Sequence, residues 1–228
     1  MLEFFNGYKK QIQEVAVIGL GRFGSAVALT LERHGVHVLG IDKDPRLVQQ
    51  YADRLTQTVA LDATDEAAMR EVGINHFETV VAAIGTNFEC NLIAVVNCKS
   101  MGVKNVFAKA LTQTQHDILL KVGADRVVLP EREAGEQAAL ELLGMHSLGR
   151  LAHDAEYTLV EMDIPPGLVG RTLMQCALRN RYGLTVIAVE RDGKIIAIPD
   201  ASWKFVDNDR LVVMGRDEEI AALRQAES

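Results

Sequence analysis

The chain has 228 residues, 48% of them hydrophobic, and a formal net charge of −7 from 24 lysines and arginines against 31 aspartates and glutamates. This length supports one good core and a smaller one, and the acidic balance argues against nucleic acid or an anionic membrane surface as main partner. The three cysteines have no metal-ligand spacing and no apolar stretch approaches the roughly 18 residues of a membrane helix, so we expect a soluble, cytosolic protein.

The first predicted element is a strand over residues 14–18 that enters a glycine-rich turn. The segment reads VAVIGLGRFG, and Gly19, Gly21 and Gly24 have the GxGxxG spacing. The first glycine permits a tight turn, the second lets a phosphate approach the backbone, and the third lets the next helix pack closely on the strand. The helix predicted over 23–34 then points its free amides and positive dipole end at the phosphates.

A second predicted strand, over residues 36–41, ends at Asp42, roughly 20 residues after the last glycine, where an acid in such folds accepts ribose hydroxyls. A lone GxGxxG is weak evidence, but here the strand, loop, helix, strand and acid occur in register. Together they predict a nucleotide-binding Rossmann unit.

The chain then continues to alternate strand and helix signals. Strands are predicted at 14–18, 36–41, 57–61, 78–84, 105–108 and 125–129, and helices at 23–34, 45–54, 65–72, 88–101, 112–121 and 131–145. The apolar runs are continuous, which is typical of strands buried on both faces. The pattern predicts an α/β fold, a Rossmann-like doubly wound parallel sheet over residues 12–131.

The pattern changes near Tyr157. The predicted elements are strands at 157–164, 185–189, 195–198 and 210–214, with helices at 172–179 and 217–226. Asp192-Gly193 is the signature of a tight hairpin between two of these strands. We therefore expect a small α+β domain over 151–226, joined to the first by a crossover helix and linker over 132–150.

In an open parallel sheet, ligands lie beyond the carboxyl ends of the strands. The candidate nucleotide-binding residues at these ends are Gly19, Gly21, Arg22, Phe23, Gly24, Asp42, Lys43, Asp62, Ala63, Ile84, Gly85, Lys109 and Glu131. Ile84 and Gly85 suit the flat face of an adenine ring.

Four of these side chains have an ordinary structural alternative. Arg22 either clamps a polyphosphate or is solvated, and Lys109 either neutralises a phosphate or is solvated. Asp62 meets adenine or ribose, or belongs to plain helix capping. Glu131 holds a divalent cation beside phosphates, or compensates a helix dipole.

The sequence shows no Tyr-x-x-x-Lys, no histidine paired with a nucleophile motif and no evident acid–base pair. A Rossmann domain without such chemistry favours a sensor over an enzyme. An NAD-dependent oxidoreductase is the alternative, against which the small C-terminal domain counts. A nucleotide-sensing domain of another transporter is a third hypothesis.

Further segments match one family. They are IDKD (41–44), DATD (62–65), VAAIG-x-N (81–87), AKA (108–110), GADRVVLPEREAG (123–135) and GRTLMQCALRNRYGLTVIAVERDG (170–193). With the glycine loop, they resemble the cytosolic regulatory subunits of Ktr/Trk potassium uptake systems, which consist of an RCK N-terminal and an RCK C-terminal domain. The resemblance runs from Gln13 to Ala222, and its single copy is similar to the Ktr type, KtrA-like, rather than to the duplicated Trk type.

The resemblance implies a homo-octameric ring of dimers, docked on the cytoplasmic face of a separate membrane potassium channel subunit. It implies ATP or ADP, and in related proteins NAD(H), at the strand ends, with nucleotide exchange gating potassium flow. Arg22 should then reach a γ-phosphate, Asp42 the ribose and Lys109 the phosphates. Glu131 should take part in a Mg²⁺ or Ca²⁺ site.

In some relatives the C-terminal domain dimer binds cyclic di-AMP. Here Arg171, Arg179, Asn180 and Arg181 form a basic cluster that either binds an anionic ligand or is a solvated face.

The predicted crossover helix carries an apolar stripe formed by Ala134, Ala138, Leu142 and Met145. This stripe either pairs with another subunit or packs on the chain's own sheet.

Overall fold

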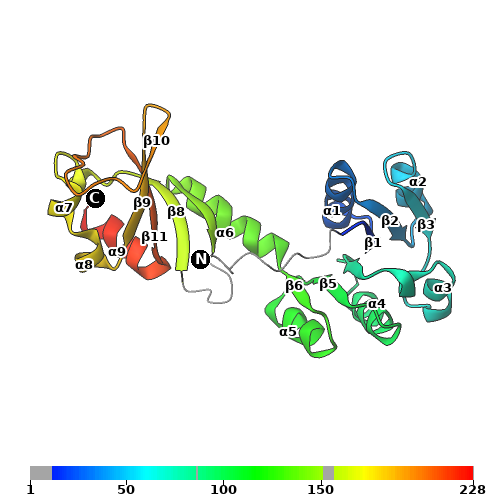
Figure 1. Ribbon diagram of the computed structural model, residues 1–228. Helices are drawn as coiled ribbons and strands as arrows, with labels where there is room; N and C mark the ends of the chain where they lie inside the picture. The colour runs from blue at the N-terminus through cyan, green and yellow to red at the C-terminus, as the bar shows by residue number, and fades with distance from the viewer. Residues whose placement is uncertain (1–11, 86, 151–156, 228) are drawn as a thin grey trace, which may run out of the picture. The chain divides into compact units, whose positions relative to one another are not determined.

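The computed structural model describes residues 12–85, 87–150 and 157–227 (Figure 1). The chain forms two compact units, one up to Arg132 and one from Glu133 onward. Neither holds, in its described part, a helix long and apolar enough to cross a membrane.

The first unit alternates strands and helices along the chain. Its elements are β1 (Glu14–Ile18), α1 (Arg22–Arg33), β2 (His37–Asp42), α2 (Pro45–Tyr51), β3 (Gln57–Ala60), α3 (Glu66–Glu71), η1 (Ile74–His76), β4 (Thr79–Ala82), α4 (Phe88–Ser100), β5 (Asn105–Lys109), α5 (Gln113–Lys121) and β6 (Arg126–Val128). The six strands form one parallel sheet in the order β3-β2-β1-β4-β5-β6. The predicted doubly wound sheet is confirmed.

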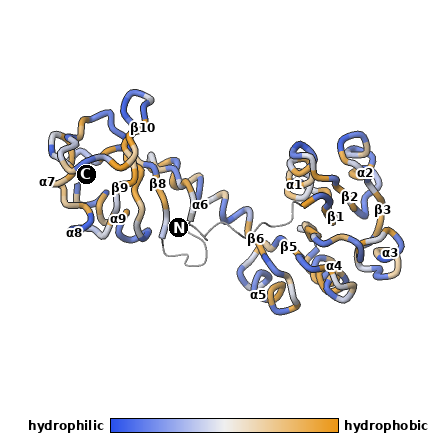
Figure 2. The backbone as a smooth tube through the Cα atoms, viewed as in Figure 1, coloured by the Kyte–Doolittle hydropathy of each residue, from blue (hydrophilic) through white to orange (hydrophobic). Residues whose placement is uncertain are grey.

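The sheet carries an apolar core on each face, because successive side chains of a strand point to opposite sides. In β1, Ala16 and Ile18 belong to one core, while Val15 and Val17 belong to the other. All four are at most 2% exposed. Burial on both faces explains the continuous apolar runs in the sequence, and Figure 2 shows hydrophobic residues along β1 and β2. The carboxyl ends of the strands are thereby held together at one edge of the sheet.

The second unit is an antiparallel sheet with small helices. Its elements are β7 (Met145–Arg150), β8 (Tyr157–Asp163), η2 (Pro166–Leu168), α7 (Leu173–Cys176), α8 (Leu178–Tyr182), β9 (Thr185–Arg191), β10 (Lys194–Ala197), β11 (Arg210–Arg216) and α9 (Asp217–Ala226). The strand order is β10-β9-β11-β8-β7. Asp192 and Gly193 both have positive φ angles, 52° and 74°, as a two-residue hairpin turn requires.

The connection between the units differs from the expected helix and linker. Helix α6 (Pro130–Leu142) carries the chain from one unit into the other, but it ends before Gly144, whose φ of 69° suits a helix end. The chain then forms β7, which pairs antiparallel with β8. Residues 145–150 are thus a strand of the second sheet rather than a linker.

The early end of α6 also divides the predicted apolar stripe. Met145 lies in β7, is 6% exposed and packs in the core of the second unit, so its assignment to the helix stripe is wrong. Ala134, Ala138 and Leu142 remain on α6, and all three are exposed. Leu142 is 90% exposed.

The helix predicted over 172–179 is two short helices, α7 and α8. The break is at Ala177, which has a φ of 46°. Such left-handed backbone is uncommon for a residue with a side chain and ends a regular helix. As a result, Arg179, Asn180 and Arg181 belong to α8, while Arg171 precedes α7.

Candidate functional site

The glycine loop between β1 and α1 has a separate structural reason for each glycine. Gly19 has a φ of +96°, and a Cβ there would lie 3.0 Å from the backbone of Ala83 and Ile84. A Cβ at Gly24 would overlap the Gly19 carbonyl oxygen, so this close approach of α1 to the loop requires glycine. At Gly21 a Cβ would meet no described atom within 4 Å. The backbone at Gly21 is therefore open to a ligand.

Helix α1 begins at this open backbone. Its N-cap is Gly21, which has no side chain with which to cap the helix, and its first turn carries no acidic residue. The first amides of an α-helix lack intrahelical acceptors and lie at the positive end of its dipole. The start of α1 is thus suited to bind an anionic group such as phosphate.

Asp42, at the end of β2, is fixed by two backbone amides. Its Oδ2 accepts from the Leu20 amide at 2.7 Å and its Oδ1 from the Asp44 amide at 2.8 Å. The first bond ties the carboxylate to the glycine loop. Because a carboxylate can accept about four hydrogen bonds, each oxygen retains capacity for a ribose hydroxyl.

A second carboxylate lies at the end of β3. Asp62 accepts from Lys43 Nζ at 2.6 Å and from the hydroxyl and amide of Thr64 at 2.7 and 3.1 Å. The hydrogen bond from Lys43, followed by those from Thr64, lowers the pKa of Asp62 to about 2. The cap of α3 is Asp65, which accepts from the Ala68 amide at 3.1 Å, so capping does not account for Asp62.

The end of β5 brings together four of the candidate residues. Lys109 Nζ lies 2.7 Å from Glu131 Oε1 and 5.8 Å from the centroid of the Phe23 ring. A Cβ at Gly85 would lie 3.3 Å from the same ammonium. The Lys109 side chain is only 10% exposed, so the alternative of a solvated lysine is wrong.

Glu131 lies in the first turn of α6. Its hydrogen bond with Lys109 lowers the pKa of the Glu131 carboxyl, and the charge of Arg22 acts in the same direction. In the described part of the chain, no group of three or more histidine, cysteine, aspartate or glutamate side chains is placed to hold a metal ion. A divalent cation at Glu131 would therefore need other ligands, such as phosphate oxygens.

The remaining candidates either pack in the core beside the strand ends or lie on the surface. Ala63 is 4% exposed and belongs to the core, and Ile84 packs against the same core. Arg22 is exposed at the start of α1. Exposure leaves Arg22 available to a ligand and is consistent with both a polyphosphate clamp and a solvated arginine.

Two buried asparagines of α4, missing from the sequence candidates, support the strand-end loops. Asn91 is 1% exposed and donates to the Lys109 carbonyl at 2.9 Å. Asn97 is 8% exposed and donates to the carbonyls of Ala63 and Thr64 at 3.2 and 3.3 Å. The sequence did carry a signal for them. Two asparagine side chains lie among apolar residues of a predicted helix, and buried side-chain amides need hydrogen-bond partners.

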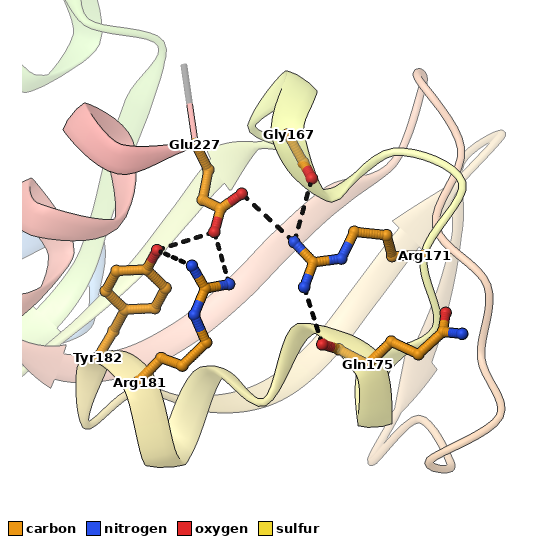
Figure 3. Close-up of polar contacts among 6 residues, drawn as sticks. All are labelled: Gly167, Arg171, Gln175, Arg181, Tyr182 and Glu227. Carbon is orange, nitrogen blue, oxygen red and sulfur yellow. Dashed lines mark hydrogen bonds and ion pairs between the residues drawn. The ribbon is translucent and has the colours of Figure 1, made fainter.

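The basic cluster of the second unit is engaged with a carboxylate of its own chain (Figure 3). Glu227, whose side chain is 7% exposed, pairs with Arg181 Nη1 at 2.7 Å and with Arg171 Nη1 at 3.5 Å. The Tyr182 hydroxyl donates to Glu227 at 2.8 Å, and Arg171 also donates to the Gln175 carbonyl at 2.8 Å. Arg179 and Asn180 are exposed on α8.

This network changes the interpretation of the cluster. Arg171 and Arg181 are not simply solvated, because both pair with Glu227, but one carboxylate balances only one of the two positive charges, and their side chains are 36% and 42% exposed. An anionic ligand such as cyclic di-AMP would share these two guanidinium groups with Glu227 or bind through Arg179 and Asn180. Glu227 was not among the residues predicted from the sequence, because it follows Arg171 by 56 residues.

Two family models match the chain. The TrkA-N domain matches residues 15–130 and the TrkA-C domain matches residues 158–227. Ktr system potassium uptake protein C of Bacillus subtilis is 33% identical over 209 residues, which cover 92% of this chain and 95% of the relative. Ktr system potassium uptake protein A of Vibrio alginolyticus is 32% identical over 209 residues, with the same coverage. The chain belongs to the Ktr potassium uptake protein family.

The fold of this Ktr family member also matches a solved channel structure. The GsuK channel bound to NAD aligns with a TM-score of 0.64 and 16% identity, over 96% of this chain and 40% of the longer channel chain. At this identity the likeness concerns the fold alone. It extends over both the TrkA-N and the TrkA-C parts of the chain.

The Glu227 network leads to a prediction for the stability of the TrkA-C unit. Hydrogen bonds led by that from Tyr182 lower the pKa of Glu227 below its ordinary 4.5, so its stabilisation is complete above that pH and is lost as pH falls through the lower, folded-state pKa. Glu227→Gln should reduce the free energy of unfolding by about 1.5–3 kcal/mol at pH 7, and this difference should shrink below about pH 4.5.

Denaturant unfolding followed by the fluorescence of Trp203, the single tryptophan of the chain, measures this effect in the second unit. Glu218→Gln, which alters an exposed carboxylate of α9, the helix that ends just before Glu227, is the matched control and should change little. Equal stability of Glu227→Gln and the unsubstituted protein at pH 7 would contradict the assigned role.

Proposed function

We propose that this protein is a nucleotide-sensing regulatory subunit that controls potassium flux through a separate membrane subunit. The observation that carries the proposal is the set of groups at the strand ends. Open backbone at Gly21, an oriented carboxylate at Asp42 and a nearly buried ammonium at Lys109 all belong to one edge of one parallel sheet. Such an edge is where nucleotides bind in doubly wound folds.

The ligand class follows from the charges at this edge. The amides of α1 and the ammonium of Lys109 suit phosphates, while the two oxygens of Asp42 suit the hydroxyls of an unmodified ribose. A 2′-phosphate would be repelled by the Asp42 carboxylate. ATP, ADP and NAD(H) therefore fit better than NADPH, and NAD is the nucleotide in the matched GsuK structure.

A regulatory role fits better than catalysis. An NAD-dependent oxidoreductase would need an acid–base group beside the cofactor and a substrate pocket. At the strand ends, Lys43 pairs with Asp62 and Lys109 pairs with Glu131. Of the other ionisable candidates, Asp42 is assigned to the ribose and Arg22 to a phosphate, so neither is assigned to acid–base catalysis. Membership in the Ktr family supports the same choice.

The proposed assembly is a homo-octameric ring of dimers on the cytoplasmic face of the membrane, attached through its potassium channel partner. The exposed apolar positions of α6, Ala134, Ala138 and Leu142, support pairing between copies of the chain. Arg22, exposed at the start of α1, is placed by this proposal on the γ-phosphate of ATP in a neighbouring subunit. Glu131 would then share a Mg²⁺ or Ca²⁺ ion with the phosphates.

If Arg22 contacts the third phosphate, the protein distinguishes ATP from ADP rather than binding both alike. Arg22→Ala should weaken ATP binding about 10- to 100-fold, because a charge-assisted contact to the third phosphate is typically worth roughly 1.5–3 kcal/mol. ADP affinity should change by less than about threefold, since the loop amides that hold its phosphates are intact. Isothermal titration calorimetry with ATP, ADP, NADH and NADPH measures these affinities.

In the same titrations, equal losses for ATP and ADP would make Arg22 a general phosphate anchor and contradict its γ-phosphate role. Tight NADPH binding without ATP binding would contradict the ligand class itself. Arg46→Ala is the matched control, because Arg46 is an exposed arginine paired with Asp44 at 2.7 Å in the same unit. It should leave all four affinities close to those of the unsubstituted protein.

The proposed pairing through α6 gives a second test. The native protein should scatter light as an assembly near eight times the 25.0 kDa of one chain. Leu142→Glu should reduce this mass without unfolding the chain, because the side chain is 90% exposed and a carboxylate there would be buried only in the assembly. Val206→Glu, at a 40% exposed position, should leave the mass unchanged. A stable native monomer would contradict the ring.

A further inference from the structure

Lys109 and Glu131 join the proposed nucleotide site to the helix that leaves the first unit. Lys109 is the last residue of β5, and Glu131 follows Pro130 at the start of α6. The 2.7 Å contact between Nζ and Oε1 ties the end of the strand to the first turn of the helix. The chain passes into the second unit within this same helix.

The two partners have unequal surroundings. The Lys109 side chain is 10% exposed, and its ammonium lies over the Phe23 ring and beside Gly85, both next to the proposed phosphate site. The Glu131 side chain is 55% exposed, so water competes for its carboxylate and screens its side of the ion pair. The ammonium is therefore held in place by its surroundings, whereas its carboxylate partner is readily exchanged.

Bound phosphates would compete directly for this ammonium. A polyphosphate carries more negative charge than one carboxylate and accepts stronger charge-assisted hydrogen bonds. Lys109 has three donors but a single cation's charge to share between two anions. Bound phosphates therefore weaken the tie to Glu131 and leave that carboxylate without its cation unless a divalent ion replaces it.

We infer that Lys109 is a positioning residue that couples nucleotide occupancy to α6. Without nucleotide, its ammonium holds the first turn of α6 at the end of β5. With phosphates bound and no divalent cation present, it leaves Glu131, and the start of α6 loosens. This inference rests on the proposed nucleotide site.

Hydrogen–deuterium exchange of the full-length protein with ADP, in buffer containing EDTA, tests the coupling. ADP should slow exchange at the start of α1 and raise exchange of the amides of residues 134–138 at least about threefold, because these are the first amides bonded within α6. In Lys109→Met, which keeps an apolar side chain of similar length, exchange at 134–138 should be high already and should not respond to ADP.

Lys104→Met is the matched control, because Lys104 forms a similar pair with Glu78 at 3.1 Å just before the opposite end of β5. It should respond to ADP as the unsubstituted protein does. Slower exchange at α1 without any change at 134–138 would overturn the coupling and leave the nucleotide site intact. An ADP response at 134–138 in Lys109→Met would also overturn it. Unchanged exchange at α1 at high ADP concentration would contradict both the nucleotide site and the coupling.

Discussion

The close approach of α1 to the loop that follows β1 is the constraint on which the site depends. Gly24 can occupy its place only without a side chain, because a Cβ would overlap the Gly19 carbonyl oxygen. That contact fixes where α1 begins, and hence where its first amides lie. The hydrogen bond from the Leu20 amide to Asp42 then ties the loop to the end of β2. The phosphate and ribose parts of the proposed site are thus positioned by one short segment.

The two units treat their charged groups differently. In the TrkA-N unit, the charged groups at the strand ends pair with exposed groups that a ligand can replace. The partner of Lys109, for example, is Glu131, whose side chain is 55% exposed. In the TrkA-C unit, Arg171 and Arg181 surround a buried carboxylate, Glu227, that belongs to the chain itself. The first arrangement suits a ligand that comes and goes, and the second stabilises the unit by holding the end of α9 to α7 and α8.

The sequence predicted the parallel sheet and most of its elements, because glycine spacing and continuous apolar runs are local signals. It did not predict the end of α6 at Leu142 or the pairing of β7 with β8, because strand formation in a short segment depends on the side chains it packs against. The Lys109–Glu131 and Arg171–Glu227 contacts were missed because the partners are 22 and 56 residues apart in the chain. The sequence shows which residues are charged, but the fold decides which of them pair.

Potassium flux into liposomes that contain the membrane subunit tests the central claim most directly. With this protein bound to that subunit, the flux rate should differ between saturating ATP and saturating ADP, and without this protein it should not. Asp42→Ala should weaken the nucleotide dependence because the ribose loses its acceptor. A flux rate that is the same with ATP, ADP, NADH or no nucleotide, while calorimetry shows these ligands bound, would contradict the account.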